Sequence, residues 1–286
     1  MRTRIPDTRT RVPAQFATGR AGRVLLRRIV KGRGIITFMP ADYLTLAREA
    51  LSRARSITVL TGAGISAESG IPTFRDAFTG LWERFKPEEL ATPEAFIANP
   101  RLVWDWYAWR REKAIDAMPN PGHDALAELE RTCIARDANF TLVTQNVDGL
   151  HQAAGSRNVI ELHGNIRRVK CFDHHHPADS WVETGTLPPH CPLCGSMLRP
   201  DVVWFGEMLP EDALEAAMQA ARSCDVFLSV STSALVEPAA SLPFAARQAG
   251  AMVIEVNRES TPLTHAAQIS LHGAAGVILP QLVAAV

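Results

Sequence analysis

The sequence lacks any long apolar run. No stretch approaches the roughly 18 consecutive apolar residues that a membrane-spanning helix needs, so we expect no membrane partner. Cysteine is scarce as well, and only Cys191-Pro-Leu-Cys194 forms a close pair among the five cysteines. This usage argues against a disulfide scaffold and favours a reducing, cytoplasmic compartment and a metal site. At 286 residues, with 47% hydrophobic and 21% charged, the chain suits a soluble enzyme with one large domain and a smaller inserted module.

The chain has a net charge of +0, but the positive and negative residues are unevenly distributed along it. Residues 1–38 contain ten Lys or Arg and one acid, Asp7, so they carry +9 and the remainder carries −9. The segment could be a basic arm for nucleic acid or acidic partners, an Arg-rich organelle-targeting peptide, or translated sequence upstream of the real start. It contains no Ser, which weakens targeting, and Met39 precedes the first helix-like segment, which favours the last interpretation. We predict that 1–38 is a disordered extension, and we expect no nucleic-acid partner for 39–286.

Short apolar runs alternate with helix-like stretches after residue 40. Residues 41–55 predict a helix, with Leu44, Ala47 and Leu51 on one face. The alternation predicts an α/β fold, a Rossmann-like parallel sheet with flanking helices. Small or polar residues follow several strands, so we expect a ligand-binding edge where the strands end. The predicted strands are 57–60, 140–143, 225–230, 252–256 and 277–279, and further helices are predicted over 121–131 and 211–222.

Two regions interrupt this pattern. Residues 73–120 are rich in Trp and helix formers, which predicts a helical insert. Residues 166–200 contain Cys, His and Pro but too few apolar residues for a core, so we predict a small module stabilised by a metal. The single domain 39–286 would then have a core of about 41–72, 121–165 and 201–286.

The stretch GAGISAESGIPTFRD, residues 62–76, follows directly on the first predicted strand. Gly62, Gly64 and Ala67 fit the G-x-G-x-x-[GA] spacing of a strand-to-helix turn, where backbone amides approach a pyrophosphate without interference from Cβ atoms. A dehydrogenase would continue into a long amphipathic helix, whereas Gly70 and Pro72 break the helix early. We therefore predict a dinucleotide held by a loop that folds over it.

The pair Cys191 and Cys194 has the spacing of a zinc knuckle, with Cys171 twenty residues before it. His174 is the predicted fourth ligand of one zinc ion, because imidazole is a normal zinc donor. The site would be structural, since no open coordination position is indicated. Alternatively, residues 174–176 are a solvated surface run and the site is incomplete. Two further cysteines, Cys133 and Cys224, are predicted to be buried and inert.

Two more motifs follow in order: TQNVDGLH at 144–151 and ELHGN at 161–165. Together with GAGIS they resemble the sirtuin family of NAD-dependent protein lysine deacylases, and the resemblance extends over about 41–286. Each motif alone would pass for an ordinary polar turn or a core histidine. The resemblance implies a Rossmann-type domain, a zinc module and NAD consumed as a reactant. It also implies that His163 is the catalytic base, a role that suits an ordinary pKa of about 6.5.

The resemblance further implies an NAD site. The phosphates would lie on the loop after the first strand, Phe74 and Arg75 would cover the nicotinamide ribose, and Asn146 and Asp148 would contact that ribose and the carboxamide. The adenosine half would lie near the polar residues after two later strands. The implied cofactor-binding residues are Gly62, Ala63, Gly64, Ala67, Phe74, Arg75, Gln145, Asn146, Asp148, Ser231, Thr232, Ser233, Asn257 and, through its backbone, Ala275.

The implied reaction starts when the acyl-lysine carbonyl oxygen attacks C1′ of the NAD ribose and expels nicotinamide. His163 then takes a proton from a ribose hydroxyl, which attacks the resulting imidate, and water finally releases lysine and O-acyl-ADP-ribose. Because an amide oxygen is a poor nucleophile, the site must hold the reacting atoms in near-attack geometry and exclude water. The implied partners are acylated lysines of proteins, bound as extended peptide.

The helical insert contains Tyr107-Ala-Trp-Arg110, a Y-x-x-R spacing that resembles the desuccinylase and demalonylase branch of the family. Residues i and i+3 share a helix face, so Arg110 and Tyr107 could offer donors to the carboxylate of an acidic acyl group. The stretch 204–207 resembles the same branch. The alternative is simple decoration of an amphipathic helix. We expect succinyl- or malonyl-lysine as substrate, with acetyl-lysine also accepted.

One departure from the family pattern is Ser231, which stands where a glycine is usual. Two other functions remain open at this point: a protein ADP-ribosyltransferase, in which His163 would matter less, and a non-catalytic NAD- or ADP-ribose-binding module. The set of His163, Asn146 and Asp148 argues against the second.

Overall fold

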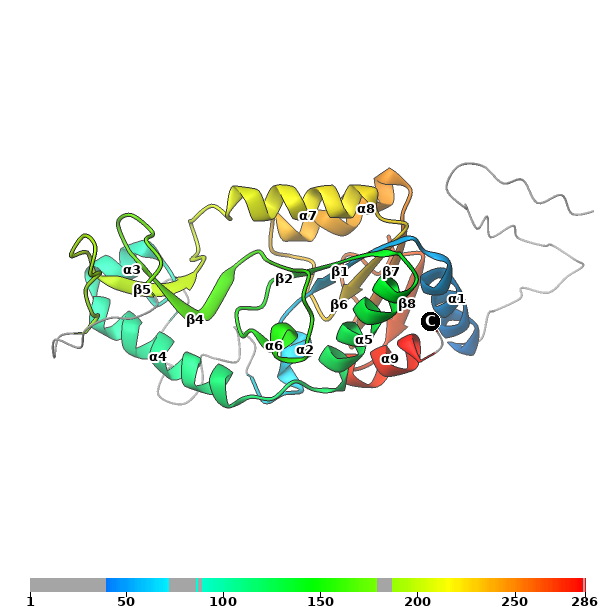
Figure 1. Ribbon diagram of the computed structural model, residues 1–286, viewed down its shortest axis with the longest axis horizontal. Coiled ribbons are helices and arrows are strands. Elements are labelled where there is room, and N and C mark those ends of the chain that lie inside the picture. Colours follow the sequence, from blue (N-terminus) through cyan, green and yellow to red (C-terminus); the bar gives the residue numbers. More distant parts are fainter. Residues whose placement is uncertain (1–39, 72–85, 87–88, 179–186, 285) are drawn as a thin grey trace, which may run out of the picture. The chain divides into compact units, whose positions relative to one another are not determined.

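Six parallel strands form the centre of the fold (Figure 1), in the order β3-β2-β1-β6-β7-β8. The computed structural model describes residues 40–71, 86, 89–178, 187–284 and 286, so the predicted basic extension lies outside the description. The strands are β1 (Ser56–Thr61), β2 (Asn139–Thr144), β3 (Val159–Glu161), β6 (Val226–Val230), β7 (Met252–Asn257) and β8 (Ile269–His272). The Rossmann-like fold predicted from the alternation is confirmed.

Helices cover both faces of this sheet, as Figure 1 shows. On one face α1 (Pro40–Arg53), α5 (Pro121–Ala135) and α9 (Ala275–Val283) pack in one apolar cluster with the strands; Leu51, Leu126 and Leu279 are among its fully buried members. On the other face α7 (Glu211–Ser223) and α8 (Leu242–Ala249) bury alanines and Leu242 against Phe227. A short 3₁₀ turn, Ala239–Ser241, precedes α8. β1 lies between β2 and β6, so the loops that leave β1 and β6 meet at the reversal of strand order, where such sheets bind ligands.

The last predicted strand, 277–279, is wrong. These residues lie inside α9, and the edge strand is β8, Ile269–His272. A short apolar run fits a buried helix as well as a strand. The true edge strand buries only alternate residues, which weakens its apolar signal.

The smaller part contains a two-stranded antiparallel sheet, β4 (Gly164–Cys171) with β5 (Leu198–Val202), and two helices, α3 (Pro93–Ala98) and α4 (Pro100–Asp116). Thr92 caps α3 by accepting from the amide of Ala95, and Asn99 caps α4 by accepting from that of Leu102; each helix then begins with Pro. Phe96, Trp106, Tyr107 and Trp204 form the centre of its apolar cluster. None of the described helices is long and apolar enough to cross a membrane.

Candidate active site and metal cluster

The loops that follow β1 and β6 interlock. The amide of Gly62 donates to the carbonyl of Val230 at 3.1 Å, and that of Gly64 donates to Ser231 at 3.2 Å. A Cβ added to Gly62 would lie 2.8 Å from the Cα of Thr232, so no side chain fits there. The helix after the loop, α2 (Gly64–Ala67), is only four residues long, as the early helix breakers predict. The glycines therefore bring two backbone segments to van der Waals contact and leave Ala63 and Ala67 exposed.

Thr232 is the point where three loops join. Gln145, after β2, donates to the Thr232 hydroxyl at 2.9 Å, and Asn257, at the end of β7, donates to its carbonyl at 2.8 Å. Ser233, next in the chain, is exposed. Ala275 begins α9, and the following amide, of Gly276, donates to Glu68 at 3.3 Å. The predicted residues of the adenosine half thus gather at the carboxyl edge of the sheet.

Asn146 and Asp148 are buried beside α2. The Asn146 amide group donates to the Ser66 hydroxyl at 3.0 Å, and its backbone N–H donates to the Thr144 hydroxyl at 3.0 Å. Its carbonyl Oδ1 is buried and has no hydrogen-bond partner among the described residues. Burial raises the pKa of Asp148 above its usual range, although the amide of Leu150 donates to its carboxylate at 2.9 Å. An orphaned buried acceptor beside a desolvated carboxyl suits a ligand that carries hydrogen-bond donors.

Two buried histidines lie behind Asn146, and their rings are 4.9 Å apart. His151 shares a hydrogen bond of 2.9 Å with the Thr61 hydroxyl, which donates to Thr144 at 2.8 Å. His123 lies 3.4 Å from the Ser66 hydroxyl. Both chains of contacts end at the residues that hold Asn146.

His163 follows β3 and is half-buried. Its Nδ1 lies 2.9 Å from the carbonyl oxygen of Gln145. A carbonyl only accepts, so Nδ1 carries the proton and Nε2 keeps its lone pair. Burial lowers the pKa of His163, so the imidazole is neutral at pH 7 and Nε2 can accept a proton.

Tyr107 and Arg110 are neighbours on α4. The Arg110 guanidinium lies 4.8 Å from the Trp106 ring centroid and 5.5 Å from that of Tyr107. Burial raises the pKa of Tyr107 to about 12 and lowers that of Arg110. The phenol of Tyr107 is therefore neutral at pH 7, and it lies beside the guanidinium of Arg110, a side chain with no acceptor and five donors.

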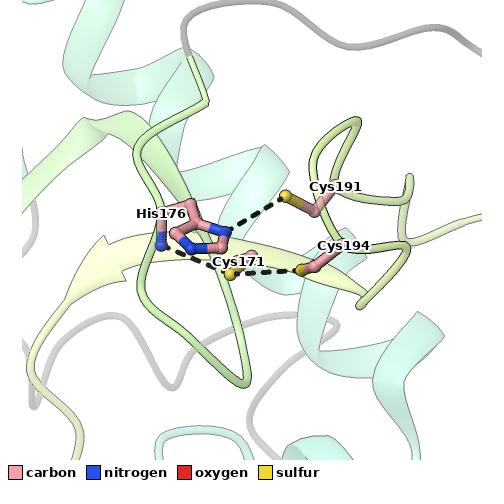
Figure 2. Close-up of side chains that lie close together, drawn as sticks. All are labelled: Cys171, His176, Cys191 and Cys194. Carbon is pink, nitrogen blue, oxygen red and sulfur yellow. Dashed lines mark hydrogen bonds between the residues drawn. The ribbon is translucent and has the colours of Figure 1, made fainter.

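Three cysteines and one histidine converge in the small module (Figure 2): Cys171, His176, Cys191 and Cys194. Their ligand atoms all lie within 4.8 Å of one another, and the sulfurs of Cys171 and Cys194 are 3.9 Å apart. Three thiols with one imidazole are a donor set that zinc prefers in tetrahedral sites, so the residues fit that metal. None of the three cysteines is in a disulfide.

The histidine of this cluster is His176, so the prediction of His174 is wrong. His175 has a left-handed φ of 55°, which turns the chain back on itself. The amide of Cys171 donates to the carbonyl of His176 at 2.9 Å, and this closes the turn. His176 therefore faces the thiols, while His174 is exposed. Cys133 and Cys224 are buried outside the cluster, as predicted, and burial raises the pKa of both thiols.

A family model described as the Sir2 family matches residues 62–238. The chain belongs to the Sir2 family. It is 51% identical over 238 residues to NAD-dependent protein deacylase 1 of Archaeoglobus fulgidus, covering 82% of this chain and 94% of that one. With an NAD-dependent protein deacylase of Thermus thermophilus it shares 55% identity over 232 residues, or 80% and 90% of the two chains.

Solved Sir2 structures have the same fold. A Sir2 homologue in complex with NAD superposes with a TM-score of 0.77 at 49% identity, covering 84% of this chain and 92% of that one. A Sir2 variant with a deacetylated p53 peptide and 3′-O-acetyl ADP ribose gives a TM-score of 0.72 at 30% identity, covering 84% and 96%.

Some residues that shape this Sir2 site were missed by sequence reasoning. Ser66 lies within the GAGIS stretch and His151 within TQNVDGLH, so both had a signal, but their contact with Asn146 or its supports depends on the fold. His123 carries a local signal too, since it forms a capping box with Asn120 at the start of α5. Phe74 and Arg75 lie outside the described residues.

Proposed function

We propose that this chain is an NAD-dependent protein lysine deacylase that removes succinyl and malonyl groups, with acetyl-lysine as a further substrate. Family membership and relatives named as deacylases at about half identity support the reaction class. The observation that carries the acyl preference is the pair formed on α4 by the buried Tyr107 and the half-buried Arg110, whose guanidinium lies 5.5 Å from the Tyr107 ring centroid.

NAD would bind along the carboxyl edge of the large sheet. The backbone of Gly62 and Gly64 allows close approach of its phosphates, and the loop around Thr232 and Asn257 would take the adenosine half. Asn146, whose Oδ1 lacks a partner among the described residues, and Asp148 would contact the nicotinamide end. When bound, NAD supplies the glycosidic bond that is broken and the ribose that receives the acyl group.

His163 is the proposed general base. Its Nδ1–H is directed to the Gln145 carbonyl, and this contact fixes the ring and leaves Nε2 to accept a proton from a ribose hydroxyl. The lowered pKa keeps this nitrogen unprotonated at neutral pH.

The acyl group would enter beside α4. Arg110 would bind its carboxylate through charge-assisted hydrogen bonds and Tyr107 would add its hydroxyl. The rings of Trp106 and Tyr107, at 4.8 and 5.5 Å from the guanidinium, restrict its position, so little conformational freedom is lost on binding. Acetyl-lysine leaves this charge unused but is small enough to be admitted.

One zinc ion at Cys171, His176, Cys191 and Cys194 would be structural. Four protein ligands complete its tetrahedral coordination, and no position is left for a substrate.

A single incubation tests the reaction. The protein is mixed with NAD and matched succinyl-, acetyl- and unmodified lysine peptides, and nicotinamide and peptide masses are followed. We expect nicotinamide release coupled to loss of the acyl group. Nicotinamide release with mass gain on the unmodified peptide would point instead to ADP-ribosyl transfer.

The variant Arg110→Met tests the acyl preference. We expect kcat/KM for succinyl-lysine to fall about 10- to 100-fold, because a hydrogen bond to a charged group contributes about 1.5–3 kcal/mol, while acetyl-lysine changes little. The matched control is Arg111→Met, because Arg111 donates to the carbonyl of Ile166 and lies over Trp104. Equal losses on both substrates with R110M would remove Arg110 from the acyl pocket.

A further inference from the structure

Arg199 is a cation buried in the small module, with a side chain only 1% exposed. A buried guanidinium is costly unless its charge is paired and its donors are bonded. Its two terminal nitrogens donate to the two carboxylate oxygens of Glu207, one of them at 2.9 Å, and Nη2 also donates to the carbonyl of Val202 at 2.8 Å. Arg199 is thus held at one end by a bidentate ion pair.

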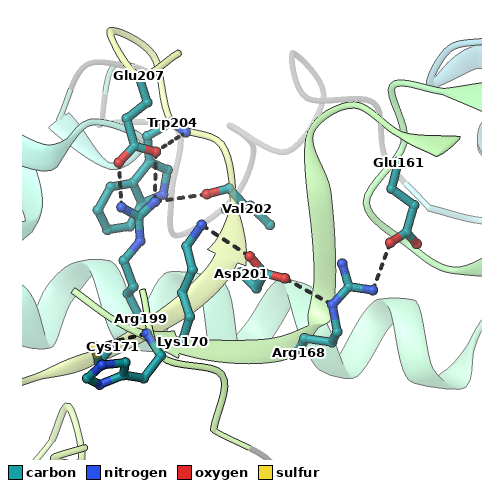
Figure 3. A network of polar contacts seen from close by, with 10 residues as sticks. Glu161, Arg168, Lys170, Cys171, Arg199, Asp201, Val202, Trp204 and Glu207 are labelled. Atoms are coloured by element: carbon teal, nitrogen blue, oxygen red, sulfur yellow. Dashed lines mark hydrogen bonds and ion pairs between the residues drawn. The ribbon is translucent and has the colours of Figure 1, made fainter. Parts of the chain in front are cut away.

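The same carboxylate holds the loop that contains Trp204. The amide of Trp204 donates to Glu207 at 2.8 Å, and the amide of Glu207 donates back to the Trp204 carbonyl at 3.1 Å. The Arg199 guanidinium lies 3.3 Å from the centroid of the indole ring (Figure 3). Although burial acts to raise it, Arg199 and the Trp204 amide hold the pKa of Glu207 below its usual range, so the pair stays ionised at pH 7. Arg199 and Glu207 therefore hold Trp204 by its ring and by its backbone.

Trp204 is in turn the neighbour of the proposed acyl pocket. Its ring centroid is 6.2 Å from that of Tyr107 and 5.3 Å from that of Phe96, and all three side chains are buried. The guanidinium of Arg110 lies over the Tyr107 ring, 5.5 Å from its centroid. Since close-packed interiors transmit strain, a shift of Trp204 is expected to displace the Tyr107 ring beside which Arg110 lies.

We propose that Arg199 and Glu207 are positioning residues for the acyl pocket, and that Arg199 also neutralises a carboxylate that would otherwise repel an acidic acyl group. The proposal rests on the function proposed above. Two consequences follow from the geometry. Loss of Arg199 loosens Trp204 and leaves Glu207 unpaired beside the pocket, whereas loss of both charges leaves no free carboxylate.

Acyl selectivity separates these consequences. We expect Arg199→Met to lower the ratio of succinyl to acetyl kcat/KM about tenfold, mainly through KM for the succinyl peptide. The double variant R199M/E207Q is expected to recover part of this ratio, because it removes the unpaired carboxylate of Glu207 while the hold on Trp204 stays lost. Arg168→Met is the matched control. Arg168 pairs with Glu161 of β3 and with Asp201 of β5, and neither contact involves the described residues of the aromatic cluster, so the ratio should stay unchanged.

Equal loss on both substrates with R199M, or a double variant no better than R199M, overturns the proposal. Should R199M fail to fold, R199K takes its place. Lysine keeps the charge but cannot stack flat or bind both carboxylate oxygens. We expect R199K to lower the ratio about threefold. An unchanged ratio counts against the clamp, by which we mean the Arg199–Glu207 pair that holds Trp204.

A second measurement needs no activity. The chain has two tyrosines, so 3-fluorotyrosine labelling gives two ¹⁹F signals, and Tyr107→Phe assigns them. In the unliganded protein, R199M should move the Tyr107 signal and leave that of Tyr43 in place, while R168M moves neither. An unmoved Tyr107 signal refutes the clamp even in an active enzyme. A moved signal in a protein without deacylase activity supports the clamp and refutes only the proposed function.

Discussion

At the scale of single residues, His176 shows how a turn selects a ligand. Residues 174 and 176 are chemically equivalent histidines, and the amides of both donate to the Cys171 sulfur at 3.3 Å. Only the left-handed backbone at His175 decides which ring faces the thiols. Sequence spacing predicts the metal and three of its ligands, but it contains no signal for this φ angle.

The two histidines can be told apart by metal analysis. We expect purified protein to contain about one zinc per chain, as a complete four-ligand site does. His176→Ala should weaken zinc binding by more than about tenfold, since even indirect partners of zinc ligands are worth that much. His174→Ala should leave the zinc content unchanged. Zinc retained by H176A but lost by H174A would reverse the assignment.

Ser231 is a second residue whose backbone matters more than its side chain. Its φ of 52° lies in the left-handed region, where a side chain costs roughly 1–2 kcal/mol and glycine costs nothing. We expect Ser231→Gly to stabilise the protein by up to about 1 kcal/mol, after allowing for the greater freedom of glycine in the unfolded chain. Urea denaturation measures this, with Ser231→Ala, which keeps a Cβ, as the control. The idea fails if the glycine variant is no more stable than the alanine variant.

At the scale of elements, the polar contacts between β1, β2, α5 and α6 (Leu150–Ala153) centre on two neutral histidines. Burial lowers the pKa of His123 to about 4 and that of His151 to about 3. Asp124 and Glu68 act to raise the first pKa, whereas His123 itself lowers the second. Both rings therefore stay neutral in the folded protein well below pH 6.5.

This pair makes stability depend on pH. Between the unfolded pKa of about 6.5 and the folded values, the unfolded chain binds protons that the folded protein does not, so stability falls as pH falls. Each histidine contributes about 1.4 kcal/mol per pH unit to this slope. The free energy of unfolding, measured by urea denaturation at several pH values between 6.5 and 5, should fall less steeply with falling pH for His151→Gln than for the unmodified protein. An identical slope would mean that His151 is protonated in the folded state.

Elements also differ in how well the sequence predicts them. The helices α1, α5 and α7 were predicted with ends within about four residues, because amphipathic periodicity persists over several turns. The apolar run at 277–279 has only three residues, too few to show helical periodicity. These residues are helical in the structure, where α9 packs against α5. The edge strand β8 is half exposed and short, so only its pairing with β7 identifies it.

At the scale of the whole molecule, motif order predicted the fold and the residues along the sheet edge. GAGIS, TQNVDGLH and ELHGN follow β1, β2 and β3, and parallel strands bring such positions together. The Arg199–Glu207 clamp could not be predicted in this way. Its members lie eight residues apart in a chain that gives no local sign of burial, and only the packing of β5 against α4 shows that the charge is enclosed.

The course of the chain through the small module has a further consequence. Gly164 pairs with Val202, and the amide of Val203 donates to the carbonyl of His163 at 2.9 Å, so residues 164–202 leave and rejoin the large domain at one point. The entropic cost of closing a loop between these two ends grows only slowly with the number of residues in the loop. Changes in the length of the segment that contains the Cys171, His176, Cys191 and Cys194 cluster are therefore expected to leave His163 in place.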